Sequence, residues 1–148
     1  MRQVRRLVLA GLMSGTVAAC GGLPTTPVFL DLTGTWNITK FEMVSQADPT
    51  LKRDELALNP GATASVVLGA DLTVTFTSNV PGQGVQVRSG TYSQTVTSVT
   101  IIFTNPTESN VFTATLVGST LSLTGANDSA DFGSGSKPAY LNITATKQ

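Results

Sequence analysis

Apolar and polar residues alternate along most of the chain from Gly34 onward. In the clearest segment, Leu72, Val74 and Phe76 alternate with three threonines. This period of two is typical of a half-buried β-strand, because successive side chains of a strand point to opposite faces of the sheet. Strands are predicted over residues 34–44, 64–68, 72–77, 85–92, 99–104, 111–117, 121–124 and 139–146.

Three interruptions of this pattern carry predictions of their own. The large apolar residues change parity between Ile38 and Phe41, which indicates a bulge or sharp bend near Lys40. Residues 45–63 are irregular, with one or two helical turns expected between Leu51 and Leu58. Residues 125–138 are rich in Gly, Ser and Asp and are predicted to form a loop.

Eight short strands with short connections favour antiparallel pairing. The 23 Thr and 13 Ser residues fit this all-β class, because Thr is β-branched and prefers strands. An open meander would leave two unpaired edges, and closure removes them. The predicted fold is therefore an eight-stranded antiparallel up-and-down barrel, with a flattened β-sandwich as the alternative.

The apolar positions of these strands predict the interior of the barrel. A barrel of eight strands either fills with side chains or holds one small ligand. The short chain and its brief strands favour a close-packed core over a ligand pocket. The candidate lining residues are Trp36, Ile38, Phe76, Val87, Ile101, Phe103, Phe112, Leu116 and Leu123, and the wider predicted interior adds Leu72, Val74, Val85, Val99, Leu121, Leu141 and Ile143.

The N-terminal segment has the pattern of an export signal. Three arginines within Met1–Arg6 precede an apolar run over Leu7–Ala19, which is too short for a stable membrane-spanning helix. The tetrad Val17-Ala18-Ala19-Cys20 resembles the lipobox of bacterial lipoproteins. That resemblance implies acylation of Cys20 and a signal peptide over 1–19, followed by a lipidated tether over 20–31 and a folded domain over 32–148. An ordinary signal peptide with a chance cysteine is the alternative.

Charge and composition exclude several classes of function. Removal of residues 1–19 takes three arginines and no acids, so nine acidic and six dispersed basic residues remain, with a net charge of −3. Nucleic-acid binding needs clustered basic residues and is therefore excluded. The chain has no His and a single Cys, so no His-activated nucleophile and no His- or thiolate-based metal site is expected. We predict no catalytic residues, no metal and no cofactor.

Several short motifs resemble those of lipocalins and of bacterial lipocalin-like domains. They are Gly34-Thr35-Trp36 on the first strand, the turn Gly69-Ala70-Asp71 before a strand, Gly90-Thr91-Tyr92, and Leu121-Ser122-Leu123-Thr124 near the end. The resemblance implies a barrel whose Trp36 plugs one end and whose open mouth admits a small apolar molecule. Lipocalins stack an Arg from the end of the barrel on that Trp, whereas Lys147 is the only cation nearby here. The similarity is therefore to the broader lipocalin-like group.

These observations together predict a non-catalytic lipocalin-like binding module, anchored in the bacterial cell envelope through lipid on Cys20. Gly21 after the cysteine favours the outer membrane, with a cell-surface anchor or secretion as alternatives. The expected partners are the membrane and a small hydrophobic ligand. The alternative is a solid-core barrel that binds an envelope protein as an accessory or inhibitory lipoprotein.

Overall fold

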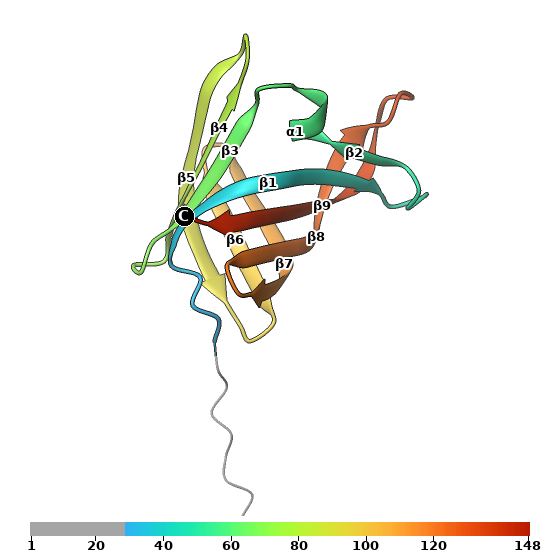
Figure 1. Ribbon diagram of the computed structural model, residues 1–148. Helices are drawn as coiled ribbons and strands as arrows, with labels where there is room; N and C mark the ends of the chain where they lie inside the picture. The colour runs from blue at the N-terminus through green and yellow to red at the C-terminus, as the bar shows by residue number, and fades with distance from the viewer. Residues whose placement is uncertain (1–28) are drawn as a thin grey trace, which may run out of the picture.

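The computed structural model describes residues 29–148 (Figure 1). The predicted signal peptide, Cys20 and most of the predicted tether lie outside the described residues. The described part contains nine strands and one short helix. Their bounds are β1 Gly34–Ser45, β2 Lys52–Asp54, α1 Glu55–Leu58, β3 Thr63–Leu68, β4 Thr73–Val80, β5 Gly84–Gln94, β6 Ser98–Thr104, β7 Thr107–Val117, β8 Thr120–Asp131 and β9 Ser136–Lys147.

Eight of these strands form a closed antiparallel barrel, as the alternation predicted. From β3 to β9 each strand pairs with the next one along the chain, and β1 closes the ring by pairing with both β3 and β9. The ninth strand, β2, pairs only with Glu42–Val44 near the end of β1. β3 pairs with residues 34–38 of β1, and β2 pairs with residues 42–44 on the same edge. β2 therefore extends the barrel wall at one end.

A bulge in β1 confirms the prediction of an irregularity near Lys40. The register between β1 and β9 shifts between Ile38 and Lys40. Ile38 before the shift and Met43 after it are both buried, although strict alternation would place them on opposite faces. The bulge therefore lets both halves of β1 contribute apolar side chains to the interior.

The prediction of a loop over 125–138 is wrong. β8 continues to Asp131 and β9 begins at Ser136, so only residues 132–135 connect them. The register shifts between Leu123 and Ala126, and the buried residues of β8 beyond the shift are the small Ala126 and Ala130. A strand whose core face carries alanine gives no strong alternation in the sequence.

The segment between β1 and β3 contains one helical turn, within the range that the sequence predicted. Only Glu55–Leu58 is helical, and the residues before it form β2. The Asp54 carboxylate caps this turn by accepting from the backbone N–H of Leu56 at 3.0 Å and of Ala57 at 3.4 Å. Asp-x-Thr sequences at Asp48 and Asp71 use the same device in turns, where the aspartate accepts from both the backbone and the hydroxyl of the threonine.

One end of the barrel is closed by Trp36, whose side chain is fully buried. Its indole Nε1 donates a hydrogen bond of 2.8 Å to the carbonyl oxygen of Leu32, which lies just before the barrel. Leu32 is itself 1% exposed, so the chain covers the base of the barrel as it enters. We call this the closed end. A layer of fully buried side chains packs there, including Leu68, Val74, Val99 and Leu121.

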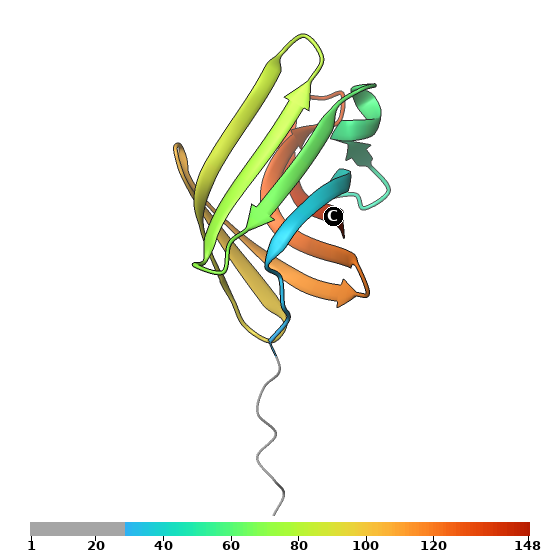
Figure 2. The ribbon, with the colours of Figure 1, turned by 60° about the vertical axis from the view of Figure 1, so that its left-hand side comes forward.

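The opposite end, which we call the open end, carries the tips of the longest hairpins. Figure 2 shows the β4–β5 tip, the β8–β9 tip and α1 at the same end of the molecule. The β4–β5 hairpin projects beyond its neighbours because β6 pairs only with residues 90–94 of β5. The first half of β5 therefore has a partner on one side only.

This arrangement corrects three of the predicted interior positions. Val85 and Val87 are 62% and 60% exposed, and Leu72 is 49% exposed. Tyr92 faces the core, so the even-numbered positions of β5 point inward and its two valines point outward. Leu72 lies in the turn before β4, with a φ of 65°, and is not part of the strand.

Candidate functional site

The open end of the barrel contains two adjoining cavities. The inner one, of about 80 Å³, is called the inner chamber, and the outer one, of about 330 Å³, is called the vestibule. The side chains of Phe41 and Phe76 line both of them. The inner chamber is lined by Phe41, Phe76, Arg88, Ile101, Phe103, Glu108, Asn110, Phe112, Asp128, Leu141 and Ile143.

Aromatic rings form one wall of the inner chamber. The ring centroids of Phe41 and Phe76 lie 6.1 Å apart, and those of Phe76 and Phe103 lie 6.5 Å apart in an edge-to-face arrangement. The guanidinium carbon of Arg88 lies 4.2 Å from the Phe103 centroid. Arg88 is thus held inside the barrel by a cation–π contact as well as by its charged partner.

A polar cluster of three residues lies beside these rings, because Arg88 pairs with Phe76 and Glu108 pairs with Phe103 on neighbouring strands. Arg88 Nη2 donates to Glu108 Oε2 at 2.7 Å, and Asn110 Nδ2 donates to Glu108 Oε1 at 3.0 Å. The hydrogen bond from Asn110 and then the neighbouring Arg88 hold the pKa of Glu108 below its ordinary value of 4.5. Glu108 is therefore ionised at neutral pH, and its charge is balanced by Arg88.

The cluster leaves hydrogen-bonding capacity unused. Asn110 is 4% exposed, and its Oδ1 has no hydrogen-bond partner among the described residues. Arg88 Nε is also buried without a partner in this part of the chain. A buried polar group without any partner costs about 1–3 kcal/mol, and such groups are usually paired with an ordered water or with a ligand atom.

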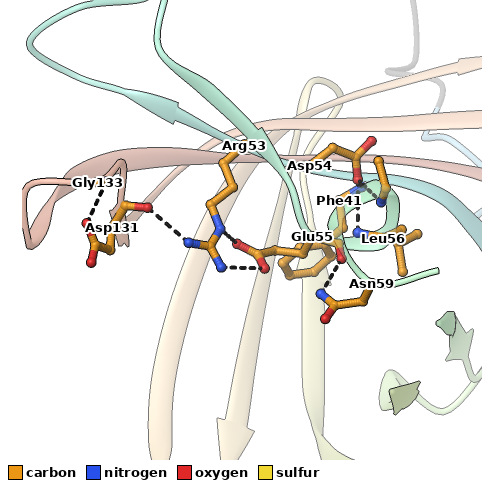
Figure 3. A network of polar contacts seen from close by, with 9 residues as sticks. Phe41, Arg53, Asp54, Glu55, Leu56, Asn59, Asp131 and Gly133 are labelled. Carbon is orange, nitrogen blue, oxygen red and sulfur yellow. Dashed lines mark hydrogen bonds and ion pairs between the residues drawn. The ribbon is translucent and has the colours of Figure 1, made fainter. Parts of the chain in front are cut away.

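A second polar network crosses the rim of the vestibule (Figure 3). The Arg53 guanidinium is bound by both carboxylate oxygens of Glu55, and its Nη1 donates to the carbonyl oxygen of Asp131 at 3.0 Å. Glu55 in turn belongs to α1, which Asn59 closes through a 2.7 Å bond from Nδ2 to the Glu55 carbonyl. Arg53 therefore ties the β2–α1 segment to the end of β8.

The Asp131 side chain organises the other end of this network. Its Oδ1 accepts from the backbone N–H of Gly133 at 2.7 Å and of Gly135 at 2.9 Å, which shapes the β8–β9 turn. These backbone hydrogen bonds are the main cause of a lowered Asp131 pKa. Asp131 therefore has two roles: its side chain fixes the β8–β9 turn, and its backbone carbonyl accepts the hydrogen bond from Arg53.

Two grooves of about 440 Å³ each flank the rim on its outer side. Leu51 and Phe132 line both grooves. Leu51 is 46% exposed, and Leu58 at the end of α1 is 58% exposed. The rim therefore presents apolar side chains to the surroundings.

The nine candidate residues divide into four groups in the structure. Phe76, Ile101, Phe103 and Phe112 line the inner chamber. Trp36, Ile38 and Leu123 are buried in the packed core, and Leu116 is half-buried against it. Val87 is exposed and takes no part in the chamber. The apolar pattern thus located one wall of the cavity.

The polar cluster of Arg88, Glu108 and Asn110 was not predicted, although the sequence contains a signal for it. On β7, the inward positions Phe112 and Ala114 continue by steps of two to Asn110 and Glu108. On β5, Tyr92 continues in the same way to Arg88. If every second residue of β5 and β7 is assigned to the interior, whether apolar or polar, the three residues of the cluster are identified.

The lining of the inner chamber is partly apolar and partly polar. Within residues 29–148, no three acidic, cysteine or histidine side chains gather as a metal site would require. The chamber instead combines apolar rings with a few fixed polar groups, which is the usual composition of a small-molecule site. Fold and site together define an eight-stranded antiparallel meander barrel with a lined cavity at one end.

Comparison with known proteins adds no closer assignment. No protein-family model matches the chain, and no curated protein sequence matches it.

No helix among the described residues is both long enough and apolar enough to cross a bilayer.

Proposed function

We propose that this protein is a non-catalytic binding module that takes a small, largely apolar molecule into the open end of its barrel. The observation that carries the proposal is the inner chamber, which is lined by four phenylalanine rings and by Asn110, whose Oδ1 is buried without a partner among the described residues. A solid core would fill this space with apolar side chains and leave no polar atom without a partner.

The closed end supports a lipocalin-like assignment within this proposal. Trp36 plugs the barrel as the Gly-x-Trp resemblance implies, and Lys147 places its Nζ 5.4 Å from the centroid of the Trp36 ring. Gly34 has a φ of +127°, and a Cβ there would lie 3.0 Å from Lys147 Cε. The backbone conformation thus favours the glycine of the motif, whereas the flexible end of the Lys147 side chain could move aside for a Cβ.

We further propose that lipid on Cys20 anchors the domain in the bacterial outer membrane. The lipobox-like tetrad before Cys20 supports this anchor, and the chain enters the barrel at the closed end, beside Leu32. The mouth of the barrel therefore lies at the end opposite the proposed anchor. A ligand would then enter from the aqueous side of the envelope.

The binding proposal is tested with residues 21–148 and the neutral dye N-phenyl-1-naphthylamine. We expect one dye per protein by titration, or a copurified small molecule in native mass spectrometry. Ser78 points inward and lines the vestibule, whereas its neighbour Asn79 is exposed. Ser78→Trp should abolish dye binding and Asn79→Trp should preserve it. Absence of stoichiometric binding and of any copurified molecule would overturn the proposal.

The anchor is tested separately in cells. Cys20→Ser and inhibition of lipoprotein signal peptidase by globomycin should each release the mature protein from the membrane fraction. If neither treatment changes the amount of protein in the membrane fraction, the lipid anchor is overturned. The binding proposal would not be affected by that result.

The apolar rim favours a second candidate function, that of an accessory or inhibitory lipoprotein that docks an envelope protein. Leu51 and Leu58 are exposed beside the two outer grooves. A photo-crosslinking residue at Leu58 would capture one defined partner in cells if this function holds, whereas the same residue at exposed Val117 on the other end would not. Equal crosslinking at both positions would contradict it.

A further inference from the structure

The charges around the inner chamber constrain what it can hold. Its lining contains two carboxylates, Glu108 and Asp128, and one cation, Arg88. Arg88 is already paired with Glu108 at 2.7 Å. A carboxylate or phosphate head group would therefore meet an excess negative charge, with no unpaired cation in the chamber wall to bind it.

The orientation of Asn110 defines the group that must face it. Because a carboxylate accepts hydrogen bonds only, the Asn110 amide must turn its Nδ2 toward Glu108. Its Oδ1 is then an acceptor, which stays buried and unpartnered within the described chain. Only a molecule with an O–H or N–H donor can satisfy it.

Arg88 adds the complementary requirement. Its buried Nε–H is a donor without a partner among residues 29–148. An ammonium group has donors but no acceptor, so it would leave this N–H unpaired and would bring a second cation beside Arg88. A hydroxyl or a primary amide supplies a donor and an acceptor in one neutral group.

The size of the chamber limits the shape of the head. Benzene occupies engineered cavities of about 150 Å³, and the inner chamber measures about 80 Å³. It therefore admits a hydroxyl or amide with a few carbons, and not an aromatic ring. Since Phe41 and Phe76 line both cavities, the rest of a slender molecule would extend past these rings into the vestibule of about 330 Å³.

We infer that the inner chamber selects a neutral head, a hydroxyl or primary amide on a slender alkyl chain, through Asn110 Oδ1 and Arg88 Nε. This inference rests on the proposed binding function and specifies the ligand class. The vestibule holds the alkyl chain, and the pair of carboxylates excludes anionic lipids that share the same chain.

The first test compares four probes of equal chain length: 1-octanol, octanamide, octanoate and octylamine. Each is titrated into residues 21–148 by calorimetry and by displacement of N-phenyl-1-naphthylamine. We expect 1-octanol and octanamide to bind about 10-fold tighter than octanoate and octylamine, the size expected of one or two buried hydrogen bonds. Octanoate or octylamine binding as tightly as 1-octanol would overturn the inference.

The second test removes the acceptor. Asn110→Leu keeps the number and branching of the side-chain heavy atoms and replaces the amide with an apolar group, and Val111→Thr changes the exposed neighbour on the same strand as a control. We expect Asn110→Leu to weaken 1-octanol binding about 10-fold and to leave the affinity for the dye unchanged. Val111→Thr should alter neither. Unchanged 1-octanol binding in Asn110→Leu would overturn the role of Asn110.

The outcomes separate this inference from the proposed function. If the dye does not bind the wild-type protein and no small molecule copurifies with it, the binding function itself fails. If the dye binds and the four octyl probes show no preference, only the inferred head group fails. A crystal structure in 1-octanol that retains only an ordered water on Asn110 Oδ1 would also overturn the inference. The probe comparison uses the wild-type chain, so it stands even if Asn110→Leu does not fold.

Discussion

Lys147 near the end of β9 lies over the ring of Trp36 near the start of β1, with its Nζ 5.4 Å from the ring centroid. The same two residues are direct partners in the β1–β9 ladder that closes the barrel. The contact therefore joins the first and last strands of the folded domain, whose pairing closes the barrel. It also shields the closed-end indole from one side.

Removing this charge should weaken the closure of the barrel. Lys147→Met keeps the aliphatic stem and loses the cation–π attraction, so we expect a loss of about 0.5–1 kcal/mol in the free energy of unfolding by urea. Lys137→Met, at an exposed position of the same strand near the open end, is the matched control. Equal unfolding midpoints for the two variants would contradict a role for the contact.

A second prediction concerns the close approach of β5 to β6 at Gly90. A Cβ at this position would lie 1.9 Å from the carbonyl oxygen of Ile102. Backbone atoms cannot move aside cheaply, so Gly90→Ala should cost about 3 kcal/mol or more. Gly82 has a φ of +82° with open space around its missing Cβ, so Gly82→Ala should cost only about 1–2 kcal/mol. Thermal unfolding of the two variants, with no difference between them, would show that the strands can separate at Gly90.

Acid should destabilise the protein through its paired carboxylates. The folded state lowers the pKa of Glu108 through Asn110 and Arg88, and side-chain and backbone hydrogen bonds lower those of Asp48, Asp71 and Asp131. The stabilisation is fully present above the ordinary pKa of each group, and it is lost as pH falls through the lowered folded pKa. We expect urea midpoints to fall below about pH 4.5, and Glu108→Gln to reduce that slope. An unchanged slope in Glu108→Gln would exclude Glu108 as a contributor.

The rim network should control how readily the vestibule opens. Arg53→Met removes the bonds to Glu55 and to the Asp131 carbonyl, and we expect faster amide hydrogen exchange over residues 52–59. Global stability should change little, because the ion pair is partly exposed to solvent. Lys52→Met, on the same short strand and outside the network, is the control. If exchange rises equally in both variants, Arg53 does not hold the segment.

Much of the fold follows from alternation, and the failures have a common physical cause. Threonine and large apolar residues alternate across β4, so its two faces are unmistakable in the sequence. The buried residues of β8 beyond Leu123 are Ala126 and Ala130, which are too small to stand out in the sequence. Here the ladder with a neighbouring strand, and not hydrophobic contrast, extends the strands.

The candidate site was only half predictable for a related reason. Phe76 and Phe103 were identified because apolar residues on a strand are expected to face inward. Arg88 and Asn110 were not, since polar residues are normally assigned to the outer face of a strand. Their inward direction depends on the parity of the whole strand, and their mutual contact with Glu108 depends on the registers of three strands.

The bulge near Lys40 divides β1 into two halves that contact different parts of the barrel, and this can be used experimentally. Residues before it, such as Trp36, face the closed end, whereas Phe41 after it faces both cavities. Substitutions before the bulge should therefore report on folding, and substitutions after it on recognition. A scan along this single strand would separate the two properties within one set of variants.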